Sequence, residues 1–203
     1  MNCTTAWTSK NCELEKDMIN GALCKKPGWK KLEYSLHFTY LNQLILITGE
    51  QTICDIGCGA GELGRVYKDY TYEGYDLSHI VENVSKVVNP QLNYKYFDAN
   101  NFNYILFKKY DLLICNSFIS ELINPLEIIK NLLENTSKYL IIHRQKISNK
   151  TEIINYKTYA DLLTSQSIIG IEDLKEIFKE TNTCVIKEFY FDGLVSLLIT
   201  KNK

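Results

Sequence analysis

The sequence has little arginine, no closely paired cysteines and no long apolar run, and each of these absences argues against a class of protein. Only Arg65 and Arg144 are arginines among 23 basic residues, and the net charge at pH 7 is −1. Nucleic-acid readers usually rely on the arginine fork, so a general polyanion binder is not expected, although a small ordered RNA stays possible. No stretch approaches the roughly 18 apolar residues of a membrane-spanning helix.

Cysteine spacing and the start of the chain indicate the compartment. The seven cysteines include no Cys-x-x-Cys pair, and their odd number fits reduced thiols. Residues Met1 to Lys10 contain no apolar segment of the kind that directs secretion. We therefore expect a cytoplasmic protein without membrane attachment.

Length and composition predict one domain that folds around its own core. The 203 residues are 45% hydrophobic and 23% charged, and no Gly/Ser linker, charge block or repeat divides them. A chain of this mass buries about 70% of its unfolded surface. The core is therefore large enough to need no disulfide or metal.

Apolar periodicity predicts helices first and then alternating strands and helices. We expect helices over 13–24 and 29–47, separated by Pro27-Gly28, and the second carries an apolar stripe at every fourth residue. The alternation that follows is typical of parallel βαβ units. The stripe residues are Leu32, Leu36, Tyr40 and Leu44; the expected strands are Thr52–Ile56, Tyr72–Tyr75, Leu92–Phe97, Asp111–Cys115 and Tyr139–His143; the expected helices are 61–70, 79–88 and 125–136.

The C-terminal part of the chain predicts an antiparallel hairpin. A helix over 171–181 precedes two strand-like runs, Cys184–Phe191 and Leu194–Thr200, and Asp192-Gly193 between them is typical of a type I′ turn. The stretch 144–170 is longer than an ordinary strand–helix connection, so we expect it to carry specificity and to contain a short helix at 158–164. The fold class is α/β, a doubly wound parallel sheet closed by an antiparallel strand.

A glycine turn follows the first strand, in Asp55-Ile-Gly57-Cys-Gly59-Ala-Gly61. Its glycines allow a tight turn and close backbone approach to a ligand. The dinucleotide fingerprint needs glycine at the sixth position, where this chain has Glu62, and no Gly-Lys-Ser/Thr follows as in a P-loop. An acidic Asp55 and Glu62 instead suit a cofactor that carries an amino acid and a sulfonium but no phosphate.

This stretch resembles motif I of the class I S-adenosylmethionine-dependent methyltransferases, and the resemblance covers residues 50–203. It implies a sheet in the order 3-2-1-4-5-7-6, under a helical cap at 1–49, within one domain. It also implies S-adenosylmethionine as cofactor, with the ribose hydroxyls on Asp76, the adenine amino group near Asp98, and the methionine part near Asn116. The cofactor-binding residues implied are Asp55, Gly57, Cys58, Gly59, Gly61, Asp76, Leu77, Asp98, Ala99 and Asn116.

Such an enzyme mainly positions its acceptor and removes a proton, so a base is expected at the carboxyl ends of the fourth and fifth strands. His143 is the first candidate, and the alternative for it is a core or rim histidine. Glu121 is the second candidate, with a solvated loop acid as its alternative. Arg144 is expected to hold an anionic group of the substrate. His37, His79 and His143 lack metal-ligand spacing, so no metal is expected.

The leading hypothesis is methyl transfer to a small molecule, with a hydroxyl acceptor, by a monomer or homodimer. The loop Asn116-Ser117-Phe118 departs from the Asn/Asp-Pro-Pro-aromatic pattern of the family's amino-methylating branches, which disfavours nucleobase or glutamine acceptors. A protein or structured-RNA acceptor is the alternative, supported by a lysine cluster, and a non-catalytic cofactor-binding subunit is a third hypothesis. The cluster is Lys25, Lys26, Lys30 and Lys31; the expected lid residues are Trp7, Trp29, Tyr34 and His37; the long stretch carries Tyr156, Tyr159 and Gln166.

Overall fold

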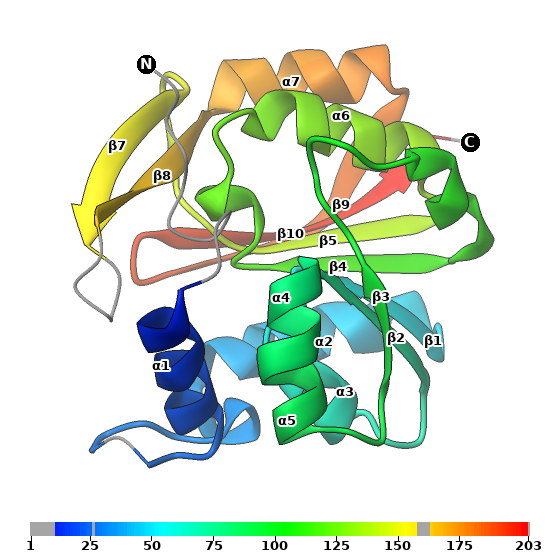
Figure 1. The fold of residues 1–203 in the computed structure, drawn as a ribbon. Helices are drawn as coiled ribbons and strands as arrows, with labels where there is room; N and C mark the ends of the chain where they lie inside the picture. Colours follow the sequence, from blue (N-terminus) through cyan, green and yellow to red (C-terminus); the bar gives the residue numbers. More distant parts are fainter. Residues whose placement is uncertain (1–10, 26, 158–162, 203) are drawn as a thin grey trace.

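The computed structural model describes residues 11–25, 27–157 and 163–202, and its centre is a seven-stranded sheet (Figure 1). The strand order is β3-β2-β1-β4-β5-β10-β9. The first five strands in this order are parallel, and β10 runs antiparallel to β5 and β9. The predicted order is confirmed, because β10 and β9 are the seventh and sixth strands of this sheet. The strands are β1 (Thr52–Ile56), β2 (Thr71–Asp76), β3 (Asn93–Tyr96), β4 (Leu112–Asn116), β5 (Tyr139–Gln145), β9 (Thr183–Phe191) and β10 (Leu194–Lys201).

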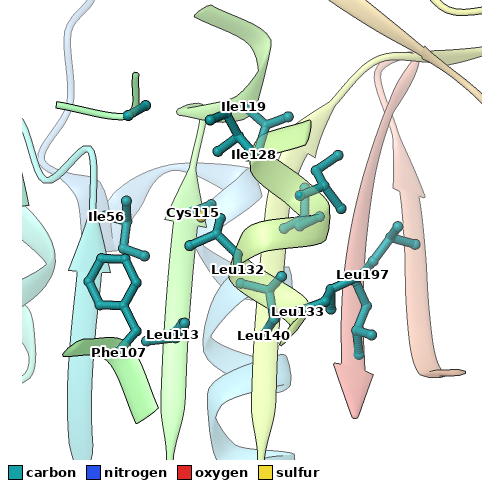
Figure 2. Close-up of a cluster of buried hydrophobic side chains, with 14 of the residues drawn as sticks. Ile56, Phe107, Leu113, Cys115, Ile119, Ile128, Leu132, Leu133, Leu140 and Leu197 are labelled. Atoms are coloured by element: carbon teal, nitrogen blue, oxygen red, sulfur yellow. The ribbon is translucent and has the colours of Figure 1, made fainter. Parts of the chain in front are cut away.

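Helices cover both faces of the sheet, which is why the central strand β4 is apolar from Leu112 to Cys115. In β4, Leu113 and Cys115 face a cluster formed with α6 (Pro125–Asn135), α7 (Ile171–Glu180) and η3 (Tyr104–Lys109), part of which Figure 2 shows. Leu112 and Ile114 face the opposite cluster, formed with α2 (Leu36–Thr48) and α3 (Glu62–Val66). All four β4 side chains are fully buried.

The predicted helix 29–47 is wrong as one element. A short 3-10 turn, η1 (Leu32–Tyr34), is followed by Ser35 in extended conformation, and α2 begins only at Leu36. The Ser35 hydroxyl donates to the Leu32 carbonyl at 2.6 Å, so a local side-chain bond competes with helical continuation. The break also changes the buried stripe: Leu36 is 64% exposed, and the helix packs through Leu41, Leu44 and Ile45.

The other helices agree with their predicted positions more closely. Helix α1 (Cys12–Ala22) packs against a helical crossover of three pieces, α4 (Ser78–Ile80), a π-helical turn η2 (Val81–Ser85) and α5 (Lys86–Val88). The Glu15 carboxylate accepts two bonds from Asn83, at 3.1 Å each, and joins the two segments. The predicted helix 61–70 is shorter, since α3 ends at Val66. Among the described residues, no helix has both the length and the apolar character to cross a membrane.

The C-terminal hairpin is confirmed, and the long stretch before it contains strands. Asp192 and Gly193 have φ of 47° and 70°, as a type I′ turn requires. A second sheet, β6-β8-β7, consists of β6 (Ile147–Ser148), β7 (Glu152–Lys157) and β8 (Leu163–Gly170). The predicted helix at 158–164 falls partly on 158–162, outside the described residues, and positions 163 and 164 belong to β8. Figure 1 shows β7 and β8 projecting from one end of the main sheet.

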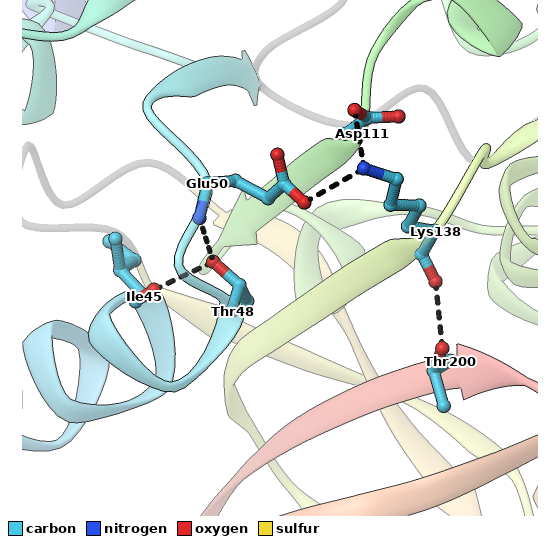
Figure 3. Close-up of polar contacts among 6 residues, drawn as sticks. All are labelled: Ile45, Thr48, Glu50, Asp111, Lys138 and Thr200. Atoms are coloured by element: carbon cyan, nitrogen blue, oxygen red, sulfur yellow. Dashed lines mark hydrogen bonds and ion pairs between the residues drawn. The ribbon is translucent and has the colours of Figure 1, made fainter.

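At the amino ends of the strands, polar contacts tie the elements together (Figure 3). Lys138 forms ion pairs with Glu50 at 3.1 Å and Asp111 at 2.8 Å, and these residues precede β5, β1 and β4. The Thr200 hydroxyl donates to the Lys138 carbonyl at 3.1 Å. Exposed pairs of this kind contribute little stability. The carboxyl ends of the same strands are where ligands bind in such sheets.

Candidate functional site

Two cavities meet at the glycine turn, at the carboxyl ends of the parallel strands. The first has a volume of about 540 Å³ and the second about 670 Å³, both within the range of small-ligand sites. Met18, Gly57, Gly59 and Arg144 line both of them. A ligand that spans this turn would therefore occupy parts of both cavities.

The glycine turn has a backbone that other residues adopt only with strain. Gly57, Gly59 and Gly61 all have positive φ, at 73°, 52° and 73°. A Cβ at Gly57 would lie 2.5 Å from Cδ2 of Phe118. The amides of Gly57 and Cys58 both donate to the Tyr75 carbonyl, at 2.8 and 3.1 Å. Side-chain atoms are thus kept out of the space beside the turn.

Two polar side chains from the segment that connects β2 to β3 form hydrogen bonds with the glycine turn. The Ser85 hydroxyl donates to the Gly59 carbonyl at 2.5 Å, and the Asn89 amide donates to the Ala60 carbonyl at 2.8 Å. Both side chains are buried, so these bonds satisfy groups that would otherwise be unpaired. These hydrogen bonds fix the conformation of the turn without a bound ligand.

Asp76 ends β2 and lies at the wall of the first cavity. Its Oδ2 accepts from the Gly59 amide at 2.8 Å and its Oδ1 accepts from the Leu77 amide at 2.7 Å. Burial raises the pKa of this carboxyl to about 6, and the two amide bonds oppose that rise. Each carboxylate oxygen has a second lone pair, so the group can still accept from a ligand.

The end of β3 supplies the next part of the first cavity. Asp98 and Ala99 line it, as does Leu77 after β2. The Asp98 carboxylate accepts from the Asn100 amide at 3.0 Å, which fixes the turn that follows the strand. The structure therefore brings together Asp76, Leu77, Asp98 and Ala99 in one cavity.

Two acids lie at the second cavity, on the other side of the turn. The buried Asp55 accepts from the Tyr72 hydroxyl at 2.8 Å, and burial raises its pKa to about 7. Burial also raises the pKa of Glu62. Cys58 lines this cavity too, and burial raises the pKa of its thiol well above the ordinary value. Gly61 lines neither cavity; it begins α3, where a Cβ would meet the Tyr94 hydroxyl.

A bulge occurs in β5 where the fourth and fifth strands end. Ile142 pairs with Leu197 and Gln145 with Val195, so His143 and Arg144 together oppose one residue, Ser196. Arg144 has φ of 63° and Ser117, at the end of neighbouring β4, has φ of 56°. Bulges re-aim side chains, and strained backbone concentrates at functional sites. Arg144 is thereby brought to the junction of the two cavities.

His143 is placed differently from what a base requires. It is 1% exposed, its Nδ1 is 2.6 Å from the Ser196 hydroxyl, and it lines neither cavity. Burial, together with the nearby Arg144 and His37, lowers its pKa to about 3. The imidazole is therefore neutral near pH 7 and lies behind the cavity wall, beside the rings of His37 and Phe191.

Three buried polar atoms near the strand ends have no hydrogen-bond partner among the described residues. They are Asn116 Oδ1, His143 Nε2 and Arg144 Nε. Asn116 and His143 are register partners on β4 and β5, and Arg144 follows directly. Asn116 lines the second cavity and Arg144 lines both, so a polar ligand there could supply the partners that these two side chains lack.

The far end of the first cavity is built by η4 (Ile119–Glu121) and by the second sheet. Glu121 accepts two bonds from the Tyr156 hydroxyl, at 2.9 and 2.7 Å. Lys146 donates to the Gln166 side-chain oxygen at 2.9 Å. Sequence reasoning singled out Tyr156 and Gln166 but missed Lys146, which lies between β5 and β6 and carried no signal in the sequence.

The N-terminal segment covers the second cavity. Trp29, Tyr34 and His37 line it, as predicted for a lid, and Met18, which the sequence did not indicate, lies at both cavities. Trp7 and Tyr159 fall outside the described residues, as does Lys26 of the predicted lysine cluster. No group of three potential metal ligands occurs in the part of the chain that the structure describes.

Comparison with known proteins gives one family and one fold. A family model for a methyltransferase domain matches residues 24–188. No curated protein matches the sequence. Similar solved structures include an S-adenosylmethionine-dependent methyltransferase from Clostridium acetobutylicum ATCC 824, with 13% identity and a TM-score of 0.65 over 95% of this chain and 100% of that one.

Two further neighbours act on natural products, according to their names. CalS10, an amino pentose methyltransferase from Micromonospora echinaspora, has 11% identity and a TM-score of 0.63, covering 96% of this chain and 99% of its own. The glycopeptide N-methyltransferase MtfA has 12% identity and a TM-score of 0.61, covering 83% and 90%. At these identities the likeness concerns the fold.

Proposed function

The chain belongs to the methyltransferase domain family, and on that premise we propose that it transfers a methyl group from S-adenosylmethionine to a small-molecule acceptor. The observation that carries the proposal is the first cavity. There the positive-φ glycine turn and the acids ending β2 and β3 lie at one end, Glu121 lies at the other, and Arg144 lies at the junction with the second cavity. One cavity thus offers a cofactor end and an acceptor end.

The residues fit the cofactor chemically. Asp76 keeps acceptor capacity for two ribose hydroxyls, and Asp98 lies where it can accept from an adenine amino group. In the second cavity, Asp55, Glu62 and the unsatisfied Asn116 Oδ1 suit an ammonium group. The glycine turn leaves room for a ligand to approach the backbone, and no phosphate-binding lysine is needed. These features support S-adenosylmethionine as the cofactor.

S-adenosylmethionine supplies an electrophilic methyl group on a sulfonium, and the protein's work is to position the acceptor and take its proton. We assign removal of the acceptor's proton to Glu121, because its carboxylate lines the first cavity. His143 is buried behind the wall of that cavity. The Tyr156 hydroxyl holds that carboxylate in place by donating to both of its oxygens. The helical cap (1–49) and the β7–β8 ribbon exclude water around a core formed by residues 50–203.

A hydroxyl, as expected from the sequence, is the first candidate for the reacting group. An amine is the second, and a specific observation favours it: Glu121 can pair with an ammonium in the cavity and accept its proton before transfer. The names of two structural neighbours, an amino pentose methyltransferase and a glycopeptide N-methyltransferase, agree with this candidate.

Other acceptors find less support. Of the lysine cluster, Lys25, Lys30 and Lys31 are exposed, as on any solvated surface. A non-catalytic subunit has no need for the Glu121–Tyr156 pair. The cytoplasmic location and the monomeric or homodimeric state expected from the sequence remain part of this proposal.

Transfer of a labelled methyl group tests the proposal. The protein is incubated with S-adenosylmethionine carrying a tritiated methyl and, separately, with size-filtered metabolites, total RNA and total protein. We expect label in the metabolite fraction only. Glu121→Gln should lower turnover by about 100-fold, the usual contribution of general-base catalysis, and leave S-adenosylhomocysteine affinity unchanged. Glu127→Gln, an exposed acid on α6, is the control. Label in RNA or protein, or full activity of Glu121→Gln, would contradict it.

A further inference from the structure

Two cations, Arg144 and Lys146, line the first cavity. Neither has an ion pair within 4 Å among the described residues, although the Glu121 carboxylate is near enough to raise the pKa of Arg144 against the lowering effect of burial. Lys146 donates to a neutral amide oxygen, that of Gln166. Glu121, an acid that lines the same cavity, accepts both bonds of the Tyr156 hydroxyl. Two cations thus face the cavity in a chain whose net charge is −1.

The fold holds Arg144 in place at an energetic cost. Its φ of 63° is left-handed, a conformation that is unfavourable for a residue with a side chain. The bulge opposite Ser196 is what aims the side chain into the cavity instead of continuing the alternation of β5. Local backbone strain of this kind is retained where it positions a functional group.

The Arg144 guanidinium also has an unused donor. Its Nε is buried and bonds to no described residue, and burial lowers the pKa of the group. A buried, unpaired donor on a charged group is among the more expensive features of a protein interior. A bound anion removes that penalty, and a carboxylate or phosphoryl group matches the planar fork with two oxygens.

We propose that Arg144 and Lys146 form an anion subsite, so that the methyl acceptor carries an acidic group, a carboxylate or a phosphoryl, beside the hydroxyl or amine that is methylated. This inference rests on the proposed function and specifies the substrate class of the same site. Arg144 would hold the anion in its fork, and Lys146, with Gln166 behind it, would add a second charge. A neutral acceptor would leave the buried Arg144 Nε without a partner and both cations without an ion pair.

The position of Lys146 separates this subsite from the cofactor. Arg144 lies at both cavities, so by itself it could face the carboxylate of the cofactor's amino acid. Lys146 lines the first cavity only, on the side of the second sheet. The part of the subsite that Lys146 supplies therefore lies away from Asp55 and Glu62, which line the second cavity.

The scarcity of arginine makes the subsite directly observable. The chain has two arginines, so the side-chain Nε–Hε region of a ¹⁵N NMR spectrum contains two signals. Arg65 is an internal control, since both of its terminal nitrogens bond to Glu33, at 3.0 and 2.7 Å. The protein is first saturated with S-adenosylhomocysteine, with binding followed by calorimetry. It is then titrated with inorganic phosphate, D-glucuronate and neutral D-glucose.

We expect a saturable shift of the Arg144 signal with phosphate or glucuronate, and no shift with glucose. The compound that shifts the signal, phosphate or glucuronate, shows whether the acidic group of the acceptor is a phosphoryl or a carboxylate. Lys146→Gln should weaken that binding by about tenfold, the effect of one charged contact, and leave S-adenosylhomocysteine affinity unchanged. The Arg65 signal should stay fixed throughout.

Three outcomes would overturn the inference. The first is an Arg144 signal that responds to neither anion, and the second is an equal response to glucose. The third is a Lys146→Gln protein that binds the anion as well as the wild type. Failure of the wild type to bind S-adenosylhomocysteine in the calorimeter would instead reject the proposed function, and the two failures are distinguishable by that step.

Discussion

At the level of single residues, solvent access separates the two groups that the sequence offered as bases. His143 and Glu121 follow strands that end at the same edge of the sheet, so position along the chain does not distinguish them. The bulge turns Arg144 into the cavity, while His143 bonds to Ser196 in the interior. Glu121 lies in the cavity beside Tyr156. Burial, which depends on packing against other elements, decides the assignment.

The buried imidazole predicts a pH dependence of stability. The pKa of His143 is about 3 in the folded chain, below the ordinary 6.5, so its contribution to stability is fully present above pH 6.5 and is lost as the pH falls toward 3. His143→Gln cannot take up this proton. We expect the free energy of unfolding in urea, measured from pH 7.5 to 5, to fall more steeply in the wild type, by up to about 1.4 kcal/mol per pH unit.

The comparison between variant and wild type isolates His143 from its neighbours. His37, with a pKa lowered to about 4, acts with the same sign, and Asp55, with a pKa raised to about 7, acts with the opposite sign, because its stability is lost as the pH rises from 3.8 toward 7. Both groups remain in the variant. Identical slopes in the two proteins would show that the imidazole titrates freely.

At the level of elements, the turn after β1 and the bulge in β5 shape the site. The turn is bonded to β2 through Tyr75 and Asp76 and to the crossover through Ser85. Its three positive-φ glycines keep the ligand side clear. The bulge places one charged side chain at the junction of the cavities. The turn and the bulge are both backbone conformations, and each depends on contacts with a neighbouring strand.

A pair of glycine variants tests the turn. Gly57 and Gly49 have similar φ, 73° and 68°, so Gly→Ala carries a similar backbone strain of about 1 kcal/mol at each. A Cβ at Gly57 would also meet Phe118 at 2.5 Å, whereas a Cβ at Gly49 would meet nothing within 4 Å.

We therefore expect Gly49→Ala to lose about 1 kcal/mol and to bind S-adenosylhomocysteine normally. Gly57→Ala should lose more stability, by urea unfolding, and should bind the ligand at least about tenfold more weakly in calorimetry, because the turn or Phe118 must move. Equal affinity in the two variants would contradict the role given to the turn.

The sequence predicted the elements that have local sequence signals. It missed the features that depend on contacts with other parts of the fold. The Asp192-Gly193 hairpin follows from turn chemistry, and the acids at the ends of β2 and β3 follow from strands that end at one edge. The sheet order came from the resemblance to the methyltransferase family. The break at Ser35 depends on one hydroxyl, and either continuation suits the apolar pattern. The bulge at Arg144 depends on the register of β10, which joins residues more than fifty positions apart. The β7–β8 ribbon has too little apolar alternation to be distinguished from a loop.

At the level of the whole molecule, the site lies between the sheet and two segments that come from different parts of the chain. The N-terminal segment closes the second cavity, and the insertion after β5 closes the acceptor end of the first. The N-terminal segment is attached to the core by the Arg65–Glu33 pair and by the Glu15–Asn83 bonds. Asp55 and Glu62 line the second cavity, Lys146 and Glu121 line the first, and Arg144 lines both.

The link between Glu33 and Arg65 predicts a coupling between cover and cofactor. Arg65 holds the pKa of Glu33 at about 2, so the stability from this pair is present above pH 4.5 and is lost as the pH falls toward 2. Glu33→Gln should lower the free energy of unfolding at pH 7 by about 1 kcal/mol, and the difference should disappear near pH 2. The S-adenosylhomocysteine affinity should also fall, because Leu32 and Tyr34 on either side line the second cavity. Unchanged affinity would mean that the cover does not touch the ligand.

The most direct test of the account is calorimetric titration of S-adenosylhomocysteine into the wild type, Asp76→Ala and Asp69→Ala. Asp69 is an exposed acid after α3 and controls for the loss of a charge. We predict micromolar binding by the wild type and by Asp69→Ala, and binding weakened by about 100-fold in a folded Asp76→Ala, since two hydrogen bonds to a charged group are lost. A folded wild type that does not bind, or an Asp76→Ala protein that binds equally well, would contradict the assignment of the first cavity, which Asp76 lines, to the cofactor.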